Sequence, residues 1–468
     1  MNILEACADP NLFAPWFRNR VTWNAWFVFL AALFGLPMDE EQQALFQTHT
    51  GRTQPPSQPQ RESWLVVGRR GGKSFIMALV AVYLACFEEY RQFLQPGERA
   101  TVAVIAADRK QARVIMRYVR GLLTRIPMLK RMVERETAEG FDLTNAVTIE
   151  VSSASFRATR GYTFAAILAD EIAFWRTDEA AVNTDTEVLT ALRPGLATIP
   201  TSVLICASSP YARSGELWQA YRKHFGKHDG PLVWHASTRA MNPSLPQDVI
   251  DAELAKDPAR AKAEYMAEFR TDIETFISQE AVQAVVIPGR YECAPRKSAF
   301  YNAFVDPSGG SGTDSFTLAI AHHEGETAVL DAVREWRPPY NPENVVEEAC
   351  AVLQQFNIRS VTGDRYAGDW VATAMKSKGG IAYKVSERTK SQLYLEFLPL
   401  LNSGRVKLLD NQRLVSQLCQ LERRTSRGSG REFIDHPLGA HDDLCNAVAG
   451  AIVATAKPSA LEVWSKLV

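Results

Sequence analysis

The chain has 468 residues, of which 46% are hydrophobic, so it is long enough for two or three domains with cores of their own. Its 52 basic and 53 acidic residues nearly cancel, and any binding of nucleic acid must therefore be local. The seven cysteines include no CxxC pair, which argues against a disulfide framework or a structural zinc site and favours a reducing cytosol.

The N-terminal stretch is predicted to be helical. Its opening, MNILEACADP, lacks the basic region and long apolar run of a secretory signal. The apolar segment WNAWFVFLAALFGLP (23–37) is too short to span a bilayer, and we expect a buried helix that ends near Gly35 and Pro37. A proline-rich surface loop should follow over 48–63. We expect a soluble protein that makes no contact with a membrane.

From Trp64 onward, short apolar runs alternate with helical stretches. Strands are predicted for the runs SWLVVG, TVAVIAAD, FAAILADE and TSVLICASSP. Continuous apolar strands interleaved with helices predict a mainly parallel sheet that is covered on both faces. Polar residues follow these strands at the sheet edge where open α/β sheets bind ligands. The sequence therefore predicts an α/β domain over residues 1–275, with an N-terminal helical extension over 1–62.

The segment VVGRRGGKSF (66–75) is predicted to be a phosphate-binding loop between a strand and a helix. It is one residue shorter than the usual pattern, which places four residues between its first glycine and Gly-Lys-Ser/Thr. Backbone amides of such a turn form a nest for anions. Taken alone, the segment is equally consistent with an ordinary surface turn. The residues expected to hold the phosphates are Gly68, Gly71, Gly72 and Lys73, with Ser74 on Mg²⁺.

A second element of an ATPase follows in the expected order. The strand FAAILADEIAF (164–174) ends in Asp170 and Glu171, of which the first can orient a metal ion and the second can polarise the attacking water. An isolated pair of acids is more often simply solvated, but the order of the two elements favours a P-loop ATPase. A third strand ends in Ser208 and Ser209, which either sense the phosphate or form a plain turn.

The pattern changes near residue 276. We predict a linker over 276–298 and a second α/β domain over 299–468, with a mixed sheet. Its first part, NAFVDPSG followed by DSFTLAIAHHEGETAVLDAVREW, predicts three strands in an antiparallel meander. A helix, a further strand and several helices should follow.

Three aspartate positions recur in an informative order in this second domain. Asp306 ends the first strand, Asp364 ends a later strand, and Asp442 with Asp443 opens an apolar helix. This order predicts an RNase H-like nuclease in which the acids hold two divalent ions. Oxygen ligands suit Mg²⁺ or Mn²⁺. Taken singly, Asp306 could be a turn residue and Asp442 a helix cap. Asp443 is favoured as the metal ligand, but the choice between it and Asp442 stays open.

Taken together, the motifs GRRGGKSF, ATRGYTFAAILADE, ASSP, FVDPS and AHDDLCNAVAG resemble the large terminase subunit of tailed bacteriophages over roughly Trp64 to Ala454. The resemblance implies an ATP-driven motor that moves double-stranded DNA into a procapsid and cuts the concatemer. It implies ATP and Mg²⁺ as cofactors, with Mn²⁺ as a substitute in the nuclease. The implied partners are a portal protein, a small terminase subunit and further copies in a ring, in the host cytoplasm and transiently at the portal vertex.

The resemblance also implies roles that spacing alone does not. Arg69 matches an arginine that touches the phosphates and stabilises charge in the transition state, with Arg70 as a second candidate. Arg160 resembles a position that acts in trans across the motor ring. Ser208 and Ser209 would couple hydrolysis to movement.

Local basic clusters are the candidates for binding DNA. Neutralisation of phosphates gives sequence-independent, salt-dependent binding. The basic helix predicted after residue 108 is equally consistent with a solvated face. A glycine-serine loop beside the predicted nuclease acids is the stronger candidate. The residues predicted to contact DNA are Arg423, Arg424, Arg427 and Arg431 of that loop, and Lys390.

Two other functions fit parts of the pattern. One is a DNA helicase or translocase whose C-terminal domain only binds DNA. The other is a non-catalytic scaffold with a degenerate nucleotide site, which the short loop suggests.

Overall fold

The computed structural model describes residues 1–154, 161–175, 184–364, 370–425, 432–437 and 440–456. The described chain forms two compact units, one extending to Thr271 and the other beginning at Asp272. The predicted boundary at residue 275 lies close to this division. In the described part of the chain, no helix is both long and apolar enough to cross a membrane.

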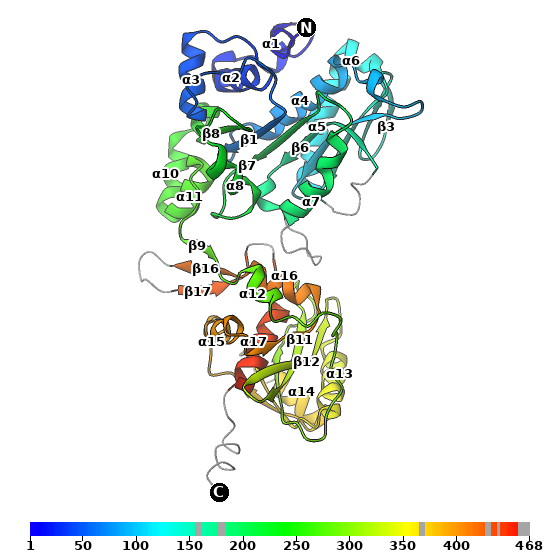
Figure 1. Ribbon diagram of the computed structural model, residues 1–468, viewed down its shortest axis with the longest axis vertical. Helices are drawn as coiled ribbons and strands as arrows, with labels where there is room; N and C mark the ends of the chain where they lie inside the picture. The colour runs from blue at the N-terminus through cyan, green and yellow to red at the C-terminus, as the bar shows by residue number, and fades with distance from the viewer. Residues whose placement is uncertain (155–160, 176–183, 365–369, 426–431, 438–439, 457–468) are drawn as a thin grey trace. The chain divides into compact units, whose positions relative to one another are not determined.

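The first unit is built on a mainly parallel sheet (Figure 1). The strand order is β3-β4-β5-β2-β6-β7-β1-β8, and every neighbouring pair from β5 to β8 is parallel, as predicted. The runs are continuously apolar because helices cover both faces, so that all of β2 is buried. The strands are β1 (Glu62–Val67), β2 (Ala100–Ala106), β3 (Val133–Glu136), β4 (Gly140–Leu143), β5 (Val147–Ser153), β6 (Thr163–Asp170), β7 (Val203–Ser208) and β8 (Leu232–Ala236).

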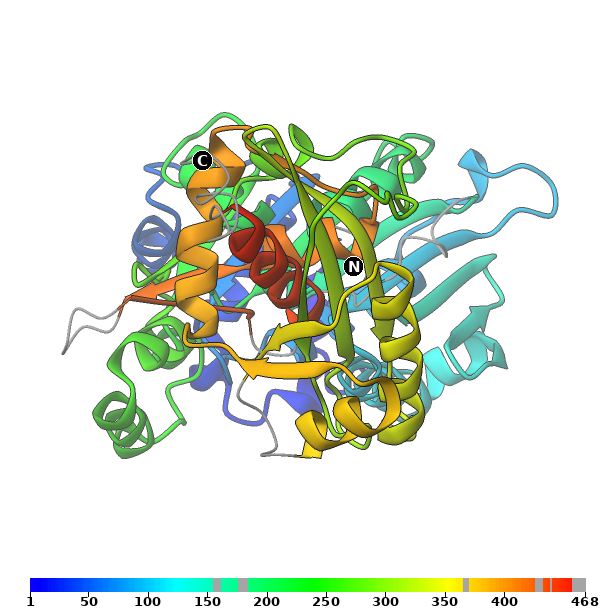
Figure 2. The same cartoon turned by 90° about the horizontal axis from the view of Figure 1, so that it is seen from below.

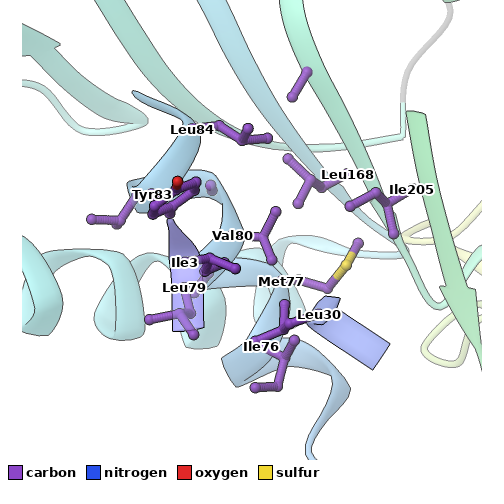
Figure 3. Close-up of a cluster of buried hydrophobic side chains, with 14 of the residues drawn as sticks. Ile3, Leu30, Ile76, Met77, Leu79, Val80, Tyr83, Leu84, Leu168 and Ile205 are labelled. Carbon is purple, nitrogen blue, oxygen red and sulfur yellow. The ribbon is translucent and has the colours of Figure 1, made fainter. Parts of the chain in front are cut away.

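The helix that follows the predicted phosphate loop, α4 (Lys73–Phe87), is buried along most of its length. Figure 3 shows its side chains, among them Val80, in one cluster with Leu168 of β6 and Ile205 of β7. The start of this helix is thus fixed against the centre of the sheet. The other helices after β1 are η3 (Arg91–Phe93), α5 (Arg109–Arg125), α6 (Pro127–Met132), η5 (Ile172–Phe174), α7 (Thr184–Leu192), η6 (Arg193–Leu196), α8 (Gly215–His224), α9 (Thr238–Met241), α10 (Gln247–Lys256) and α11 (Pro258–Met266).

The N-terminal extension packs beside this sheet, with α3 next to β8 (Figure 1). Helix α2 is buried on all sides, as its apolar sequence predicts, and it ends before Gly35, which has a positive φ of 62°. The Trp26 indole donates a hydrogen bond to the Gly71 carbonyl at 2.8 Å, so the extension supports the loop after β1. Its helices are α1 (Ile3–Ala8), η1 (Ala14–Trp16), η2 (Arg20–Trp23), α2 (Asn24–Leu33) and α3 (Glu40–Thr50).

The second unit contains a mixed sheet in the order β14-β13-β10-β11-β12-β15. Strands β10, β11 and β12 form the predicted antiparallel meander, whereas β13, β14 and β15 add in parallel. A separate antiparallel sheet has the order β17-β16-β9. The strands are β9 (Ile273–Thr275), β10 (Tyr301–Asp306), β11 (Phe316–Glu324), β12 (Thr327–Trp336), β13 (Ser360–Gly363), β14 (Ala382–Val385), β15 (Val406–Lys407), β16 (Glu422–Thr425) and β17 (Glu432–Asp435).

Helices cover both faces of the mixed sheet (Figure 2). Helix α17 packs on the face that carries Phe304, and Gly450 allows a close approach because a Cβ there would collide with that ring. Helices α13 and α14 cover the opposite face. The helices are α12 (Gln279–Gln283), α13 (Pro342–Gln355), α14 (Trp370–Gly379), α15 (Lys390–Asn402), α16 (Gln412–Gln420) and α17 (Asp443–Ala456).

The segment predicted as a linker, 276–298, contributes to the core of this unit. Phe276, Ile277, Val282 and Val285 belong to the hydrophobic cluster that α17 also joins. Their apolar side chains provide the physical reason, because burial beside α17 removes them from water.

Candidate functional site

The loop after β1 has the backbone of a phosphate nest. Gly72 adopts a φ of 100° at the start of α4, a conformation that favours glycine. Arg70 also has a positive φ, of 65°, which is uncommon for a residue with a side chain. A Cβ at Gly68 would collide with Thr238, whose hydroxyl donates a hydrogen bond to the Arg69 carbonyl at 2.7 Å. The turn is therefore tight and fastened from outside.

Lys73 and Glu171 face each other at the ends of neighbouring elements. The Lys73 side chain is only 4% exposed, and its Nζ lies 3.3 Å from Glu171 Oε1 while donating to the Val67 carbonyl at 2.9 Å. Glu171 Oε2 accepts hydrogen bonds from Ser208 Oγ at 3.0 Å and from the Ser209 amide at 3.1 Å. Strand β7 lies between β6 and β1 in the sheet, which places the two serines at this position.

Ser74 and Asp170 form a second contact beside this ion pair. Ser74 Oγ donates to Asp170 Oδ2 at 3.0 Å, and Gln111 Nε2 donates to the same oxygen at 3.0 Å. Burial and then the neighbouring Glu171 charge raise the pKa of Asp170 to about 6, and the hydrogen bond from Gln111 opposes this rise. Asp170 Oδ1 is buried without a hydrogen-bond partner in the described part of the chain. An unpaired carboxylate oxygen beside a serine hydroxyl fits Mg²⁺, which prefers oxygen ligands.

The predicted arginines are placed differently from these residues. The Arg69 side chain is 53% exposed and forms an ion pair with Glu264 Oε2 at 3.0 Å. Arg70 is exposed, and its carbonyl accepts from Asn242 Nδ2 at 2.9 Å. Arg160 lies outside the described residues. The proposed contacts of these arginines with phosphates, or with a neighbouring copy, stay predictions.

In the second unit, the structure brings Asp306 and Asp364 together. Asn446, on α17, donates from Nδ2 to Asp306 Oδ2 at 2.8 Å and to Asp364 Oδ2 at 2.6 Å. The two carboxylate oxygens therefore lie no farther apart than the sum of these distances. Burial first, and then the nearby Asp364, raise the pKa of Asp306 well above its ordinary value. Burial likewise raises the pKa of Asp364.

Asp442 and Asp443 have different partners. Asp442 Oδ2 lies 2.9 Å from Lys390 Nζ and accepts a hydrogen bond from the Tyr394 hydroxyl at 2.9 Å. Asp443 Oδ2 accepts from the Ser315 amide at 2.8 Å, and burial raises the pKa of Asp443 to about 6. Asp442 is thus neutralised by a lysine. Asp443 forms no ion pair with a lysine or arginine in the described part of the chain, and its charge acts on Asp306.

The residues predicted to contact DNA are partly engaged within the protein. Lys390 Nζ also bonds Asp435 Oδ1 at 2.8 Å, and its acidic neighbours raise its pKa. The Arg423 guanidinium lies 5.4 Å from the centre of the Phe276 ring. Arg424 pairs with Glu422 Oε2 at 3.0 Å. The other two, Arg427 and Arg431, lie outside the described residues.

No protein-family model matches the chain, and no curated protein matches it. Among solved structures, it is similar to the large terminase of bacteriophage HK97, with 15% identity and a TM-score of 0.39 over 90% of this chain and 96% of that chain. It is similar to the large terminase of a thermophilic bacteriophage in complex with ADP (12%, 0.33, 84% and 93%). A third is the large terminase nuclease of thermophilic phage G20c with bound magnesium (15%, 0.33, 37% and 96%). All three are large terminases, which the order of motifs also resembles.

Two residues of these sites were missing from the sequence interpretation. Gln111 lies in the first turn of α5, three residues after Asp108, whose side chain caps that helix. Asn446 lies three residues after Asp443, which puts both on one side of α17. The second spacing is a signal that could have been used, because a polar residue within an otherwise apolar helix beside predicted metal ligands is unusual. Nothing in the sequence indicates that Gln111 reaches Asp170.

We predict that Gln111→Leu destabilises the first unit by about 1–3 kcal/mol, because Asp170, which is buried, loses a hydrogen-bond donor. Lys110→Leu, at an exposed position on the same helix, should change stability by less than about 0.5 kcal/mol. Differential scanning calorimetry of the full chain measures both variants. Equal stability of the two would show that the bond from Gln111 contributes nothing.

Proposed function

We propose that the chain is the ATP-driven, DNA-packaging motor of a bacteriophage, with an ATPase in the first unit and a metal-dependent DNA endonuclease in the second. The observation that supports this proposal best is the presence of two separate acidic clusters suited to phosphate chemistry in one chain. One cluster joins a glycine-rich loop, a lysine and a Ser-Asp pair. The other joins three carboxylates from two strands and a helix.

In the first unit, the loop amides and Lys73 bind the outer phosphates of ATP. Ser74 and Asp170 would hold Mg²⁺, which neutralises charge on the phosphates. Glu171 orients the attacking water and accepts its proton. Binding of the triphosphate draws Lys73 away from Glu171, which frees Glu171 Oε1 for the water, since that oxygen lies 3.3 Å from the lysine in the structure.

Ser208 and Ser209 couple this chemistry to movement. Both contact the oxygen of Glu171 that faces away from Lys73, and they stand at the end of β7 in the middle of the sheet. A shift of Glu171 towards the phosphate changes these hydrogen bonds and therefore strains the β7 end. Arg69 leaves Glu264 to reach the phosphates and stabilises negative charge in the transition state.

In the second unit, Asp306, Asp364 and Asp443 bind the catalytic ions. Two divalent ions would stabilise the attacking and the leaving oxygen of the cleaved phosphodiester. Asp443 is the better candidate ligand of the adjacent pair, because Asp442 is already compensated by Lys390 and by the Tyr394 hydroxyl. Asp442 and Lys390 position the start of α17 instead.

The DNA substrate meets the second unit near the arginines of β16 and the loop that follows it. Arg423 and Arg424 supply positive charge beside the acidic cluster, which would otherwise repel the phosphate backbone. Work on the DNA as a motor further requires a ring of copies on a portal protein, with a small terminase subunit for DNA selection, in the host cytoplasm. The similarity of motif order to large terminases supports these partners.

For the first unit, we expect Lys73→Ala to lose both ATP binding and turnover, because the charge on the phosphates is no longer neutralised. Glu171→Gln should keep ATP binding and lose turnover, because the water is no longer activated. Fluorescent-nucleotide binding and phosphate release measure the two effects, and Lys223→Ala, at an exposed site on α8, is the control. Normal turnover in Glu171→Gln would contradict the ATPase assignment.

For the second unit, Asp443→Asn should reduce Mn²⁺-dependent plasmid cleavage to background. Asp442→Asn should retain cleavage with a loss of about 10–100-fold, the usual effect of a residue that orients a ligand. Plasmid linearisation by the full chain measures both. The opposite ranking would make Asp442 the ligand. Wild-type cleavage by Asp364→Ala would instead favour a translocase whose second unit only binds DNA.

A further inference from the structure

Asn446 holds a buried amide whose two ends are treated differently. The residue is fully buried, and its Nδ2 donates to both Asp306 and Asp364. Its Oδ1 is also buried, yet it has no hydrogen-bond partner in the part of the chain that the structure describes. The amide thus satisfies two carboxylates while leaving its own carbonyl unsatisfied.

An unsatisfied buried carbonyl is costly and uncommon. The loss of a partner costs about 1–3 kcal/mol, and most buried polar atoms have one. A leucine at this position would fill nearly the same volume in the apolar helix α17 without this cost. An amide here is therefore expected to use its oxygen in some state of the protein.

The position of the amide indicates which state this is. Asn446 contacts two of the carboxylates that the proposed nuclease uses for its ions, and it lies one helical turn after the third, Asp443. The nitrogen and the oxygen of an amide have nearly the same size, so a half-turn of the side chain exchanges them without steric cost. Beside a divalent cation the N–H groups are repelled, whereas the carbonyl is attracted.

We propose that Asn446 is a further ligand of the divalent-metal site, and that its side-chain amide turns so that Oδ1 faces the ion. The proposal rests on the proposed nuclease site. Asparagine carbonyls are accepted ligands of hard cations, and they suit the oxygen-only set of Asp306 and Asp364. The same side chain then has two tasks. Its nitrogen holds the two carboxylates together without an ion, and its oxygen binds the ion when it enters.

Two variants separate a metal ligand from a simple hydrogen-bond donor. Asn446→Asp removes the donor but keeps an oxygen at the ligand position, whereas Asn446→Leu removes both at similar volume. Isothermal titration calorimetry of the full chain with Mn²⁺, in the absence of DNA, measures affinity directly. We expect Asn446→Asp to bind Mn²⁺ at least as tightly as the parent, and Asn446→Leu to bind at least about tenfold more weakly.

Equal weakening in Asn446→Asp and Asn446→Leu would overturn the proposal, because the amide would then act only through its N–H groups. If Asn446→Asp does not fold, a Mn²⁺-bound crystal structure of the parent decides the matter. Oδ1 within about 2.0–2.6 Å of the ion supports the proposal, and Nδ2 on the ion side contradicts it.

The same measurements distinguish this proposal from the nuclease assignment. Mn²⁺ binding that depends on residue 446 in a parent protein that cuts no DNA would contradict the nuclease and leave the ligand assignment in place. Mn²⁺-dependent cleavage in a protein whose affinity is the same in the parent and in both variants would do the reverse.

Discussion

Carboxylates at the ends of neighbouring strands repel one another, and both units are organised by the groups that compensate this repulsion. In the first unit, Lys73 lies 3.3 Å from Glu171, and Gln111 donates to Asp170 at 3.0 Å. In the second, Asn446 donates to two aspartates at once. The pKa values of Asp170 and Asp443 are nevertheless raised to about 6, mainly by burial, so the compensation is incomplete. Divalent cations complete it, which links the stability of each site to its chemistry.

The order of the strands determines which groups can take part. In the first unit, β7 separates β6 from β1, so that serines from β7 stand against Glu171 while the lysine approaches from α4. In the second unit, β13 pairs in parallel with β10 and α17 packs across the sheet, which brings Asp306, Asp364 and Asn446 together from distant parts of the sequence. Both sites therefore depend on long-range packing, although each lies at the end of an element that local sequence specifies.

The sequence predicts the elements well, because apolar strands and glycine turns are local signals. The parallel sheet, the antiparallel meander and the buried helix over 24–33 are confirmed. The positions of Asp306 and Asp364 at strand ends could also be predicted. Long-range contacts could not, because Gln111 and Asp170 are far apart in sequence and Arg69 meets Glu264 from α11. Likewise, the pairing of Lys390 with Asp442 depends on how α15 lies beside α17.

The melting temperature of the second unit within the full chain, with Mn²⁺ and with EDTA, tests the central claim most directly. Folding raises the pKa values of Asp306, Asp364 and Asp443, so stability without an ion should fall as the pH rises from the ordinary aspartate value through about 6. At pH 7.5, Mn²⁺ should therefore raise the melting temperature of the parent, and much less that of Asp306→Asn. The gain should shrink at pH 5. An equal response of the parent and Asp306→Asn, or none in either, would contradict the account.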